Sequence, residues 1–155
     1  MRGSLTDHAG DWYEINEARV VPGCVQQPRL PLAAGAGGPR ALRLAATYGE
    51  GWITYGDTAH QHVSAAGTAA VVRRQMARLD EHLAAFGRDP STVDRIYLIG
   101  NTEARPLQSV EAFVDFAERY REIGFTDLVY NHPRADDPVW NEPQAMVEEI
   151  TARML

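Results

Sequence analysis

The sequence predicts an α/β fold with a parallel sheet, and three observations support this class. Short apolar runs alternate with longer amphipathic segments four times after residue 30. Residues 96–99 are nearly continuous in apolar character, which is typical of a strand buried on both faces. Glycine or proline marks most junctions between the segments. Because strands that alternate with helices form parallel sheets with right-handed crossovers, residues 30–155 are expected to form four βα units.

Residues 1–29 precede these units and are predicted to form a β-hairpin and a connector. Two β-prone segments, residues 12–15 and 18–21, flank Asn16 and Glu17, which suit a turn. A proline–glycine pair then ends the hairpin. Since 155 residues make one domain of ordinary size, both parts are assigned to a single domain that covers residues 1–155.

The first βα unit combines an apolar run, a glycine-rich turn and a helix. Its strand is expected over residues 30–34 and its helix over residues 39–48, with Pro39 at the first helical position, where a missing N–H loses no hydrogen bond. Gly49 is expected to stop the helix in a left-handed conformation, and the second strand to follow at residues 52–55. The apolar stripe that should face the core comprises Ala41, Leu42, Leu44, Ala45 and Ala46.

The longest helix is expected to begin at Ala65 or Thr68 and to end at Phe86. Asp80 and Glu81 lie off its apolar stripe and indicate a solvent-facing side. The stripe recurs at steps of three and four residues, as in an amphipathic helix, and comprises Val72, Met76, Leu79, Leu83 and Phe86.

Capping residues mark the helices of the last two units. Ser109 is expected to cap a helix that Gly124 ends. Asn141 is expected to cap the final helix, with Gln144 three residues on for a reciprocal bond. The strand of each unit precedes its helix, and these strands are predicted at residues 96–99 and 128–130. Four such units could form a small open sheet or half of an eight-unit barrel.

Composition excludes several kinds of partner and compartment. The formal net charge of −6 disfavours nucleic acid and anionic membranes. No apolar run approaches the roughly 20 residues of a membrane span, and the N-terminus lacks the apolar core of a signal peptide. The single cysteine, Cys24, fits a reducing compartment, so a cytoplasmic location is expected. All 15 basic residues are arginine, which excludes lysine-based chemistry.

The glycine-rich turn of the first unit is a candidate anion site. Gly35, Gly37 and Gly38 leave backbone N–H groups unobstructed beside the positive end of a helix, and Arg40 offers a forked cation to a phosphate. The alternative is a tight turn that merely needs glycines. A dinucleotide fingerprint fits less well, because Arg40 stands where its third glycine should be.

Polar residues at the carboxyl ends of the predicted strands are further candidates, since barrel enzymes place reacting groups there. His132 is the only one of them that titrates near neutral pH, and it is a weak candidate for a proton donor; a loop histidine bonded to backbone is the favoured alternative. His60 and His62 lack a clear third ligand, so no metal is expected. Three tryptophans could stack on a ring, although packing is their commoner role: Trp12, Trp52 and Trp140. The strand-end residues are Thr54, Asn101, Thr102, Asn131 and His132.

Residues 8–56 resemble the second half of luciferase-like monooxygenases, which are flavin- or deazaflavin-dependent TIM-barrel oxidoreductases. Glu50 stands where this family usually has aspartate. The residues that carry the resemblance are the lead Gln27, Pro28, Arg29 and Pro31; the helix Gly38, Pro39, Arg40, Ala41, Leu42, Arg43, Leu44, Ala45 and Ala46; and the strand start Gly51 and Trp52.

The resemblance implies the C-terminal half of a (β/α)8 barrel and hydride transfer to or from bound FMN or coenzyme F-420, with a small molecule as substrate. It implies that this half holds the cofactor tail, while most contacts to the ring and the substrate come from the first half of the barrel. The implied cofactor-binding residues are Ala34, Gly35, Gly37, Gly38, Arg40 and Thr54.

A half-barrel has two unpaired sheet edges and an open apolar interior, and exposed edges pair with other strands. The chain is therefore expected either to form a homodimer or to join a complementary N-terminal half-barrel. The rival hypothesis is a noncatalytic, truncated α/β module that binds a phosphate or a partner chain.

Overall fold

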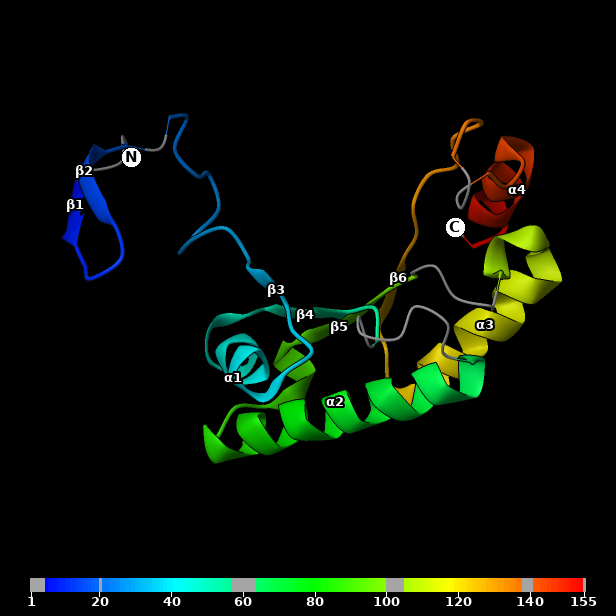
Figure 1. Ribbon diagram of the computed structural model, residues 1–155, viewed down its shortest axis with the longest axis horizontal. Coiled ribbons are helices and arrows are strands. Elements are labelled where there is room, and N and C mark those ends of the chain that lie inside the picture. The colour runs from blue at the N-terminus through cyan, green and yellow to red at the C-terminus, as the bar shows by residue number, and fades with distance from the viewer. Residues whose placement is uncertain (1–4, 20, 57–63, 100–104, 138–140, 155) are drawn as a thin grey trace. The chain divides into compact units, whose positions relative to one another are not determined.

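The computed structural model describes residues 5–19, 21–56, 64–99, 105–137 and 141–154 (Figure 1). The chain divides into two compact units, Met1–Pro31 and Leu32–Leu155. No helix among the residues described is long and apolar enough to cross a membrane.

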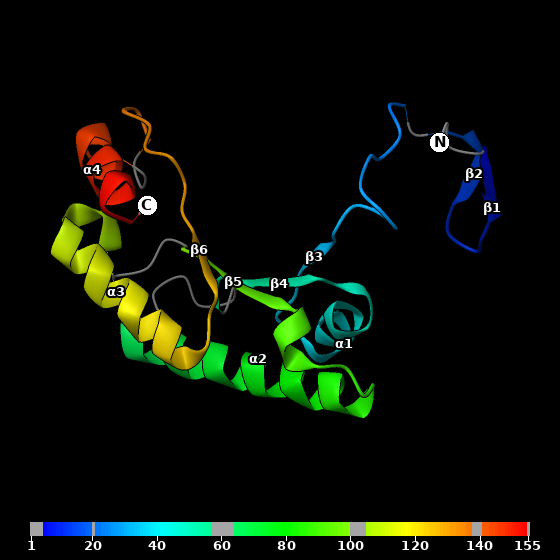
Figure 2. The ribbon, with the colours of Figure 1, turned by 180° about the vertical axis from the view of Figure 1, so that it is seen from behind.

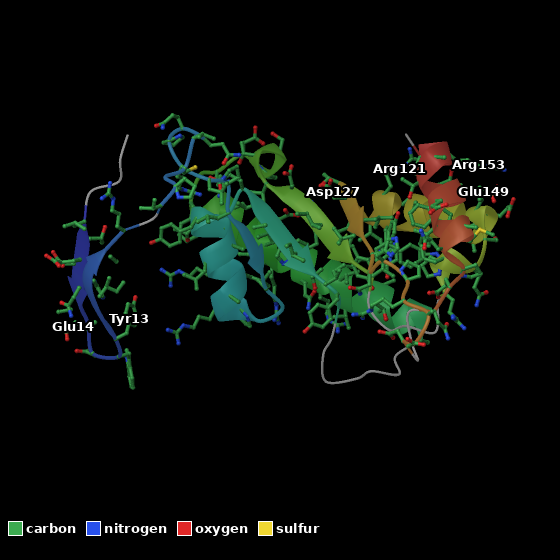
Figure 3. All side chains as sticks on the ribbon, turned by 90° about the horizontal axis from the view of Figure 1, so that it is seen from above. Tyr13, Glu14, Arg121, Asp127, Glu149 and Arg153 are labelled. Atoms are coloured by element: carbon green, nitrogen blue, oxygen red, sulfur yellow. The ribbon has the colours of Figure 1, made fainter. Side chains whose placement is uncertain are left out.

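The N-terminal unit contains the predicted hairpin, but the turn lies elsewhere. Strand β1 (Thr6–Ala9) pairs antiparallel with β2 (Glu14–Ala18), and the Gly10 amide donates to the Tyr13 carbonyl over 3.1 Å to close the turn. The predicted turn at Asn16 and Glu17 is wrong, because the earlier Gly10 supplies the flexible turn residue and both positions fall within β2. The predicted packing role of Trp12 is also wrong, because the Trp12 side chain is 93% exposed. Tyr13 projects from the same turn (Figure 3).

The C-terminal unit contains a four-stranded parallel sheet, as predicted. Its order is β3-β4-β5-β6, so strands that follow each other in sequence are neighbours in space. The strands are β3 (Ala33–Gly35), β4 (Gly51–Thr54), β5 (Asp94–Leu98) and β6 (Asp127–Val129). The helices are α1 (Pro39–Tyr48), α2 (Ala65–Ala85), α3 (Val110–Ile123) and α4 (Gln144–Met154), with short 3-10 turns η1 (Pro90–Thr92) and η2 (Pro106–Gln108).

The first strand of the parallel sheet, β3, begins later than predicted. β3 begins at Ala33 and not at Leu30, because Pro31 cannot donate to a ladder. The Leu32 amide instead donates to a carboxylate oxygen of Glu50 over 2.7 Å. Glu50 directly precedes β4, so this hydrogen bond links the chain just before β3 to the chain just before β4.

The core lies between one face of the sheet and the helices, and α1 and α2 lie side by side on that face (Figures 1 and 2). Trp52 and Tyr97 are fully buried, which fits the predicted packing role of Trp52. Phe125 joins them: its ring centroid lies 5.7 Å from that of Trp52 and 5.4 Å from that of Tyr97.

Helix α1 has the predicted bounds but a narrower buried stripe. Leu42, Ala45 and Ala46 are buried, whereas Leu44 is 53% exposed, contrary to the prediction. Gly49 was expected to be left-handed and is extended, with φ −81°. Glycine is needed there for close approach, because a Cβ would lie 2.9 Å from the Ala45 carbonyl oxygen.

Helix α2 begins at the predicted Ala65, and Ser64 caps it: its hydroxyl accepts from the Gly67 amide over 3.2 Å. Four members of the predicted stripe are buried, but Phe86 is 45% exposed because the helix ends one residue before it. Asp80 is not purely solvent-facing, since it forms an ion pair with Arg95 of β5.

Helix α3 is capped as predicted. The Ser109 hydroxyl accepts from the Ala112 amide over 3.1 Å, and Gly124 ends the helix in the left-handed region with φ 111°. The prediction for α4 is wrong at its start, because the helix begins at Gln144 and Asn141 does not cap it. Pro143 disfavours helical geometry in the residue before it, so the helix starts after the proline.

Tyr97 is buried among aromatic rings, and its hydroxyl makes no hydrogen bond of good geometry with a described residue, although the Tyr120 hydroxyl lies close enough to influence its pKa. Burial raises the pKa of this phenol above its ordinary value of 10.0. The Tyr97 phenol therefore stays neutral in the folded state at pH values where it ionises in the unfolded state. The free energy of unfolding does not depend on this group below pH 10.0, and it falls as the pH rises beyond that value.

We expect Tyr97→Phe to raise the free energy of unfolding at neutral pH by about 1 kcal/mol, because it removes an unsatisfied buried hydroxyl. The variant should also lose less stability between neutral pH and about pH 11 than the wild type does. Urea unfolding at both pH values measures this. Equal alkaline losses in the two proteins would show that Tyr97 does not control the effect.

Candidate functional site

The glycine-rich loop between β3 and α1 borders a cavity of about 450 Å³. Gly37 and Gly38 form one wall, and Gly56, just beyond β4, forms another. Helix α2 supplies the remaining lining residues, which are Val71, Arg74, Gln75 and Arg78. The cavity thus lies where the carboxyl ends of two neighbouring parallel strands meet, and this edge is the usual place for ligands in α/β folds.

The first turn of α1 has amide groups available for an anion. Gly38 is extended (φ −97°, ψ 164°), and no side chain caps the helix. The first helical amide that finds a described backbone acceptor is that of Leu42, which donates to the Gly38 carbonyl over 2.9 Å. The first turn contains no acidic residue. The positive end of the helix is therefore not neutralised by a neighbouring carboxylate of its own.

Arg74 and Arg78 add positive charge to the same cavity. They are four residues apart on α2 and so lie on one face of the helix. Both are exposed, and neither forms an ion pair with a residue that the structure describes. Among the described lining residues there is no carboxylate, and two of them are arginines. This donor set suits a phosphate or a carboxylate.

Buried hydrogen bonds hold the loop and the end of β4 in place. The Trp52 indole donates to the Ala36 carbonyl over 2.8 Å, which ties the loop to the core. The Thr54 hydroxyl donates to the Gln75 side-chain oxygen over 2.7 Å, and the Gln75 amide donates to the Gly56 carbonyl over 3.1 Å. Gln75 thus links the wall formed by α2 to the end of β4.

We expect Gln75→Leu to lower the free energy of unfolding by about 1 to 3 kcal/mol, since the buried Thr54 hydroxyl and Gly56 carbonyl would lose their partner. Urea denaturation measures the loss. Thr54→Ser keeps the hydroxyl and serves as the control, with a smaller expected change. A Gln75→Leu protein as stable as the wild type would contradict the assigned role.

The structure separates the residues that the resemblance implied as cofactor-binding. Gly37 and Gly38 line the cavity, whereas Ala34 packs partly against the core. Gly35 and Arg40 are exposed and are not among the lining residues. Thr54 is 3% exposed and bonded to Gln75, so it supports the wall of the cavity and does not itself line it.

Sequence reasoning missed Arg74, Gln75 and Arg78. A signal for them was present: Gln75 interrupts the apolar stripe of α2 with a polar side chain, and two arginines flank it with helical spacing. A buried polar position on an amphipathic helix indicates a specific partner.

The other candidates lie apart from this cavity or outside the described residues. His132 is exposed, and its Nδ1 lies 3.0 Å from the Pro133 carbonyl oxygen, in keeping with the backbone-bonded alternative. Among the residues described, no group of three His, Cys, Asp or Glu could hold a metal. The candidates that fall outside the described residues are His60, His62, Asn101, Thr102 and Trp140.

Comparisons with known proteins agree on one fold. The family model described as luciferase-like monooxygenase matches residues 1–151. A solved F420-dependent secondary alcohol dehydrogenase, in complex with an F420-acetone adduct, is 13% identical with a TM-score of 0.58; the match covers 82% of this chain and 50% of that one. The coenzyme F420-dependent tetrahydromethanopterin reductase from Methanopyrus kandleri is 13% identical with a TM-score of 0.64, and the match covers 95% of this chain and 56% of that one. The chain spans about half the length of both structures.

Proposed function

Because the chain belongs to the luciferase-like monooxygenase family, we propose that it is the C-terminal part of an oxidoreductase that uses a flavin or coenzyme F-420. Its four parallel βα units match about half of two longer enzymes of the same fold, which supports the assignment to the C-terminal half of a TIM barrel. In this proposal its task is to hold the phosphate-bearing tail of the cofactor at the glycine-rich loop.

The observation that carries the proposal is the donor set of the 450 Å³ cavity. Gly37 and Gly38, just before the uncapped start of α1, and two arginines of α2 line it, and no carboxylate is among its described lining residues. The two sources of positive charge come from different elements, so a phosphate in the cavity would bridge α1 and α2. These residues fit the anionic tail that FMN and coenzyme F-420 share.

Coenzyme F-420 is the favoured cofactor. Both solved structures compared above are F420-dependent enzymes, and they share the fold of this chain. When bound, either cofactor supplies hydride transfer. The chain's own residues would then anchor and orient it, through the two arginines and the backbone amides that border the cavity. Contacts to the ring and the substrate belong to the other half of the barrel in this proposal.

Titration of the purified chain with coenzyme F-420, FMN and inorganic phosphate tests the proposal. Quenching of deazaflavin fluorescence, the flavin absorbance and calorimetry report the three ligands. We expect saturable binding of F-420, weaker binding of FMN and competition of both by phosphate. Binding of phosphate alone would favour the rival noncatalytic module, and no binding of any of the three would contradict the assigned site.

A further inference from the structure

Gln75 is a buried polar residue that lines the cavity at the glycine-rich loop, and it is only 8% exposed. Its side-chain oxygen accepts from the Thr54 hydroxyl over 2.7 Å, and its side-chain nitrogen donates to the Gly56 carbonyl over 3.1 Å. A carbonyl oxygen can only accept, so the nitrogen of the carboxamide has to face Gly56. The two hydrogen bonds therefore fix the orientation of the Gln75 carboxamide.

The carboxamide nitrogen of Gln75 has a second N–H that is left open. Each carboxamide carries two N–H donors. Among the residues described, the Gly56 carbonyl is the only acceptor that this nitrogen finds. Buried donors are nearly always paired, whether with protein, ordered water or a ligand. The open N–H of a side chain as buried as Gln75 therefore indicates a partner outside the protein.

The glycine-rich loop leaves space for such a partner beside the nitrogen. A Cβ at Gly37 would lie 3.2 Å from Gln75 Nε2, which is the only described atom beyond the neighbouring residues that it would meet within 4 Å. The absence of a side chain at Gly37 thus keeps the approach to Nε2 open from the loop. Gly37 and Gln75 both line the cavity, so this space belongs to the cavity.

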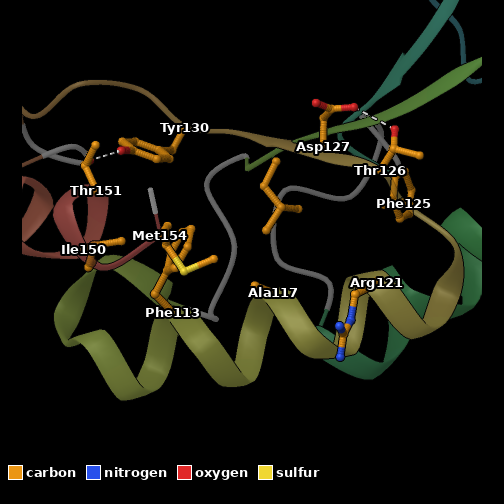
Figure 4. A pocket seen from close by; sticks show the side chains of 11 residues that line it. Phe113, Ala117, Arg121, Phe125, Thr126, Asp127, Tyr130, Ile150, Thr151 and Met154 are labelled. Atoms are coloured by element: carbon orange, nitrogen blue, oxygen red, sulfur yellow. Dashed lines mark hydrogen bonds between the residues drawn. The ribbon is translucent and has the colours of Figure 1, made fainter.

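The cavity of about 550 Å³ beside β6, between α3 and α4, has a different set of polar groups (Figure 4). Two of its hydroxyl groups already have partners: the Tyr130 hydroxyl lies 2.8 Å from that of Thr151, and the Thr126 hydroxyl donates to Asp127 over 2.6 Å. Asp127 also places a carboxylate in the lining, which repels an anion. An oxyanion therefore fits the cavity at the glycine-rich loop better.

We propose that the second N–H of Gln75 donates to an oxygen of a bound oxyanion, a phosphate or sulfate group, and that Gln75 determines the preference of the cavity for such groups. This contact lies in the anion site described above, so the inference rests on the proposed function. Arg74 and Arg78 supply charge from exposed side chains, whereas Gln75 supplies a donor whose direction is fixed before the ligand arrives. Such a donor loses little conformational freedom on binding.

Alanine at Gly37 tests the contact without removing a hydrogen bond of Gln75. The added Cβ would crowd the open N–H, and Gly37 is not among the glycines with positive φ, so alanine is tolerated there. We expect Gly37→Ala to bind inorganic phosphate and sulfate about tenfold more weakly in calorimetry, with a nearly unchanged urea midpoint. Gly35→Ala is the matched control and should bind like the wild type, because its Cβ would meet nothing within 4 Å and Gly35 does not line the cavity.

The side-chain amide signals of Gln75 report the contact directly. The two N–H protons give a pair of peaks in a nitrogen–proton correlation spectrum, and Gln75→Glu identifies the pair by its absence. Phosphate should shift one proton of the pair more than the other, since only one N–H is open. Gln75→Glu should also bind phosphate and sulfate roughly 100-fold more weakly, because a donor is replaced by a like charge. If this variant does not fold, the wild-type spectrum and Gly37→Ala still decide.

The failure of this contact and the failure of the proposed function give different results. If the wild type binds neither phosphate nor sulfate, both are overturned. If it binds them but the Gln75 amide pair does not shift, or Gly37→Ala binds them with wild-type affinity, the contact alone is overturned and Gln75 only supports the wall. If both anions bind as expected and coenzyme F-420 and FMN do not, the contact stands and the proposed function fails.

Discussion

Replacing Arg74 and Arg78 together by alanine is expected to lower the affinity of the chain for coenzyme F-420 roughly 100-fold, with about tenfold from each arginine. Each guanidinium can make a charge-assisted hydrogen bond to a phosphate oxygen, and such bonds are stronger than neutral ones. Both side chains are exposed, so water and salt weaken their contribution. Fluorescence titration at two salt concentrations measures the loss, and the double variant should show less salt dependence than the wild type.

The matched control for this experiment is Arg73→Ala. Arg73 lies on the same helix, is exposed and carries the same charge, but it is not among the residues that line the cavity. Its replacement should change affinity by less than about threefold, through long-range charge alone. An equal loss in Arg73→Ala would mean that the net charge of α2 matters and that the cavity does not. Because all three arginines are exposed, none of these variants should reduce stability appreciably.

Trp52→Ala is expected to lower the free energy of unfolding by about 3 to 5 kcal/mol, the largest effect on stability that we predict. The indole is fully buried and stacks on Phe125, so its loss leaves a large cavity in the core. It also leaves the Ala36 carbonyl without the indole donor. Since small domains are stabilised by only about 5 to 15 kcal/mol, the variant could unfold at moderate temperature. Urea unfolding followed by circular dichroism gives the value.

Two further variants keep this prediction testable even if Trp52→Ala does not fold. Trp52→Phe retains an aromatic ring and removes the hydrogen bond to Ala36, and it should cost about 1 to 3 kcal/mol. Trp12→Ala changes a tryptophan that is 93% exposed in the hairpin, and it should cost less than about 0.5 kcal/mol. Equal midpoints for Trp52→Phe and Trp12→Ala would contradict the role given to the indole.

Local signals predicted the helices well wherever one residue fixes a helix end. Pro39 at the start of α1, and Ser109 and Gly124 at the two ends of α3, act through their own backbone or side chain, and the structure places them as expected. The alternation of strands and helices likewise led to the correct prediction of a parallel sheet with four strands. Predictions failed where two local signals competed, as at Asn141, where the nearby Pro143 decides where α4 begins.

Burial and the composition of the site were harder to predict, because both depend on which helix faces meet. Leu44 belongs to an apolar stripe but lies just outside the part that the core covers. Gly37 and Gly38 could be found from the sequence, since the loop motif is local. Arg74, Gln75 and Arg78 reach the same cavity because α2 packs beside α1. The polar Gln75 on an apolar stripe indicates a specific partner, but the sequence does not say which element provides it.

The strand order β3-β4-β5-β6 has a consequence for how such proteins can evolve. Each crossover joins adjacent strands, so a cut between two units severs one connection and leaves every other unit intact. A barrel built in this way can be divided between two genes, and recombination can exchange its halves as blocks. A module that anchors a cofactor could in this manner be combined with different modules that select the substrate.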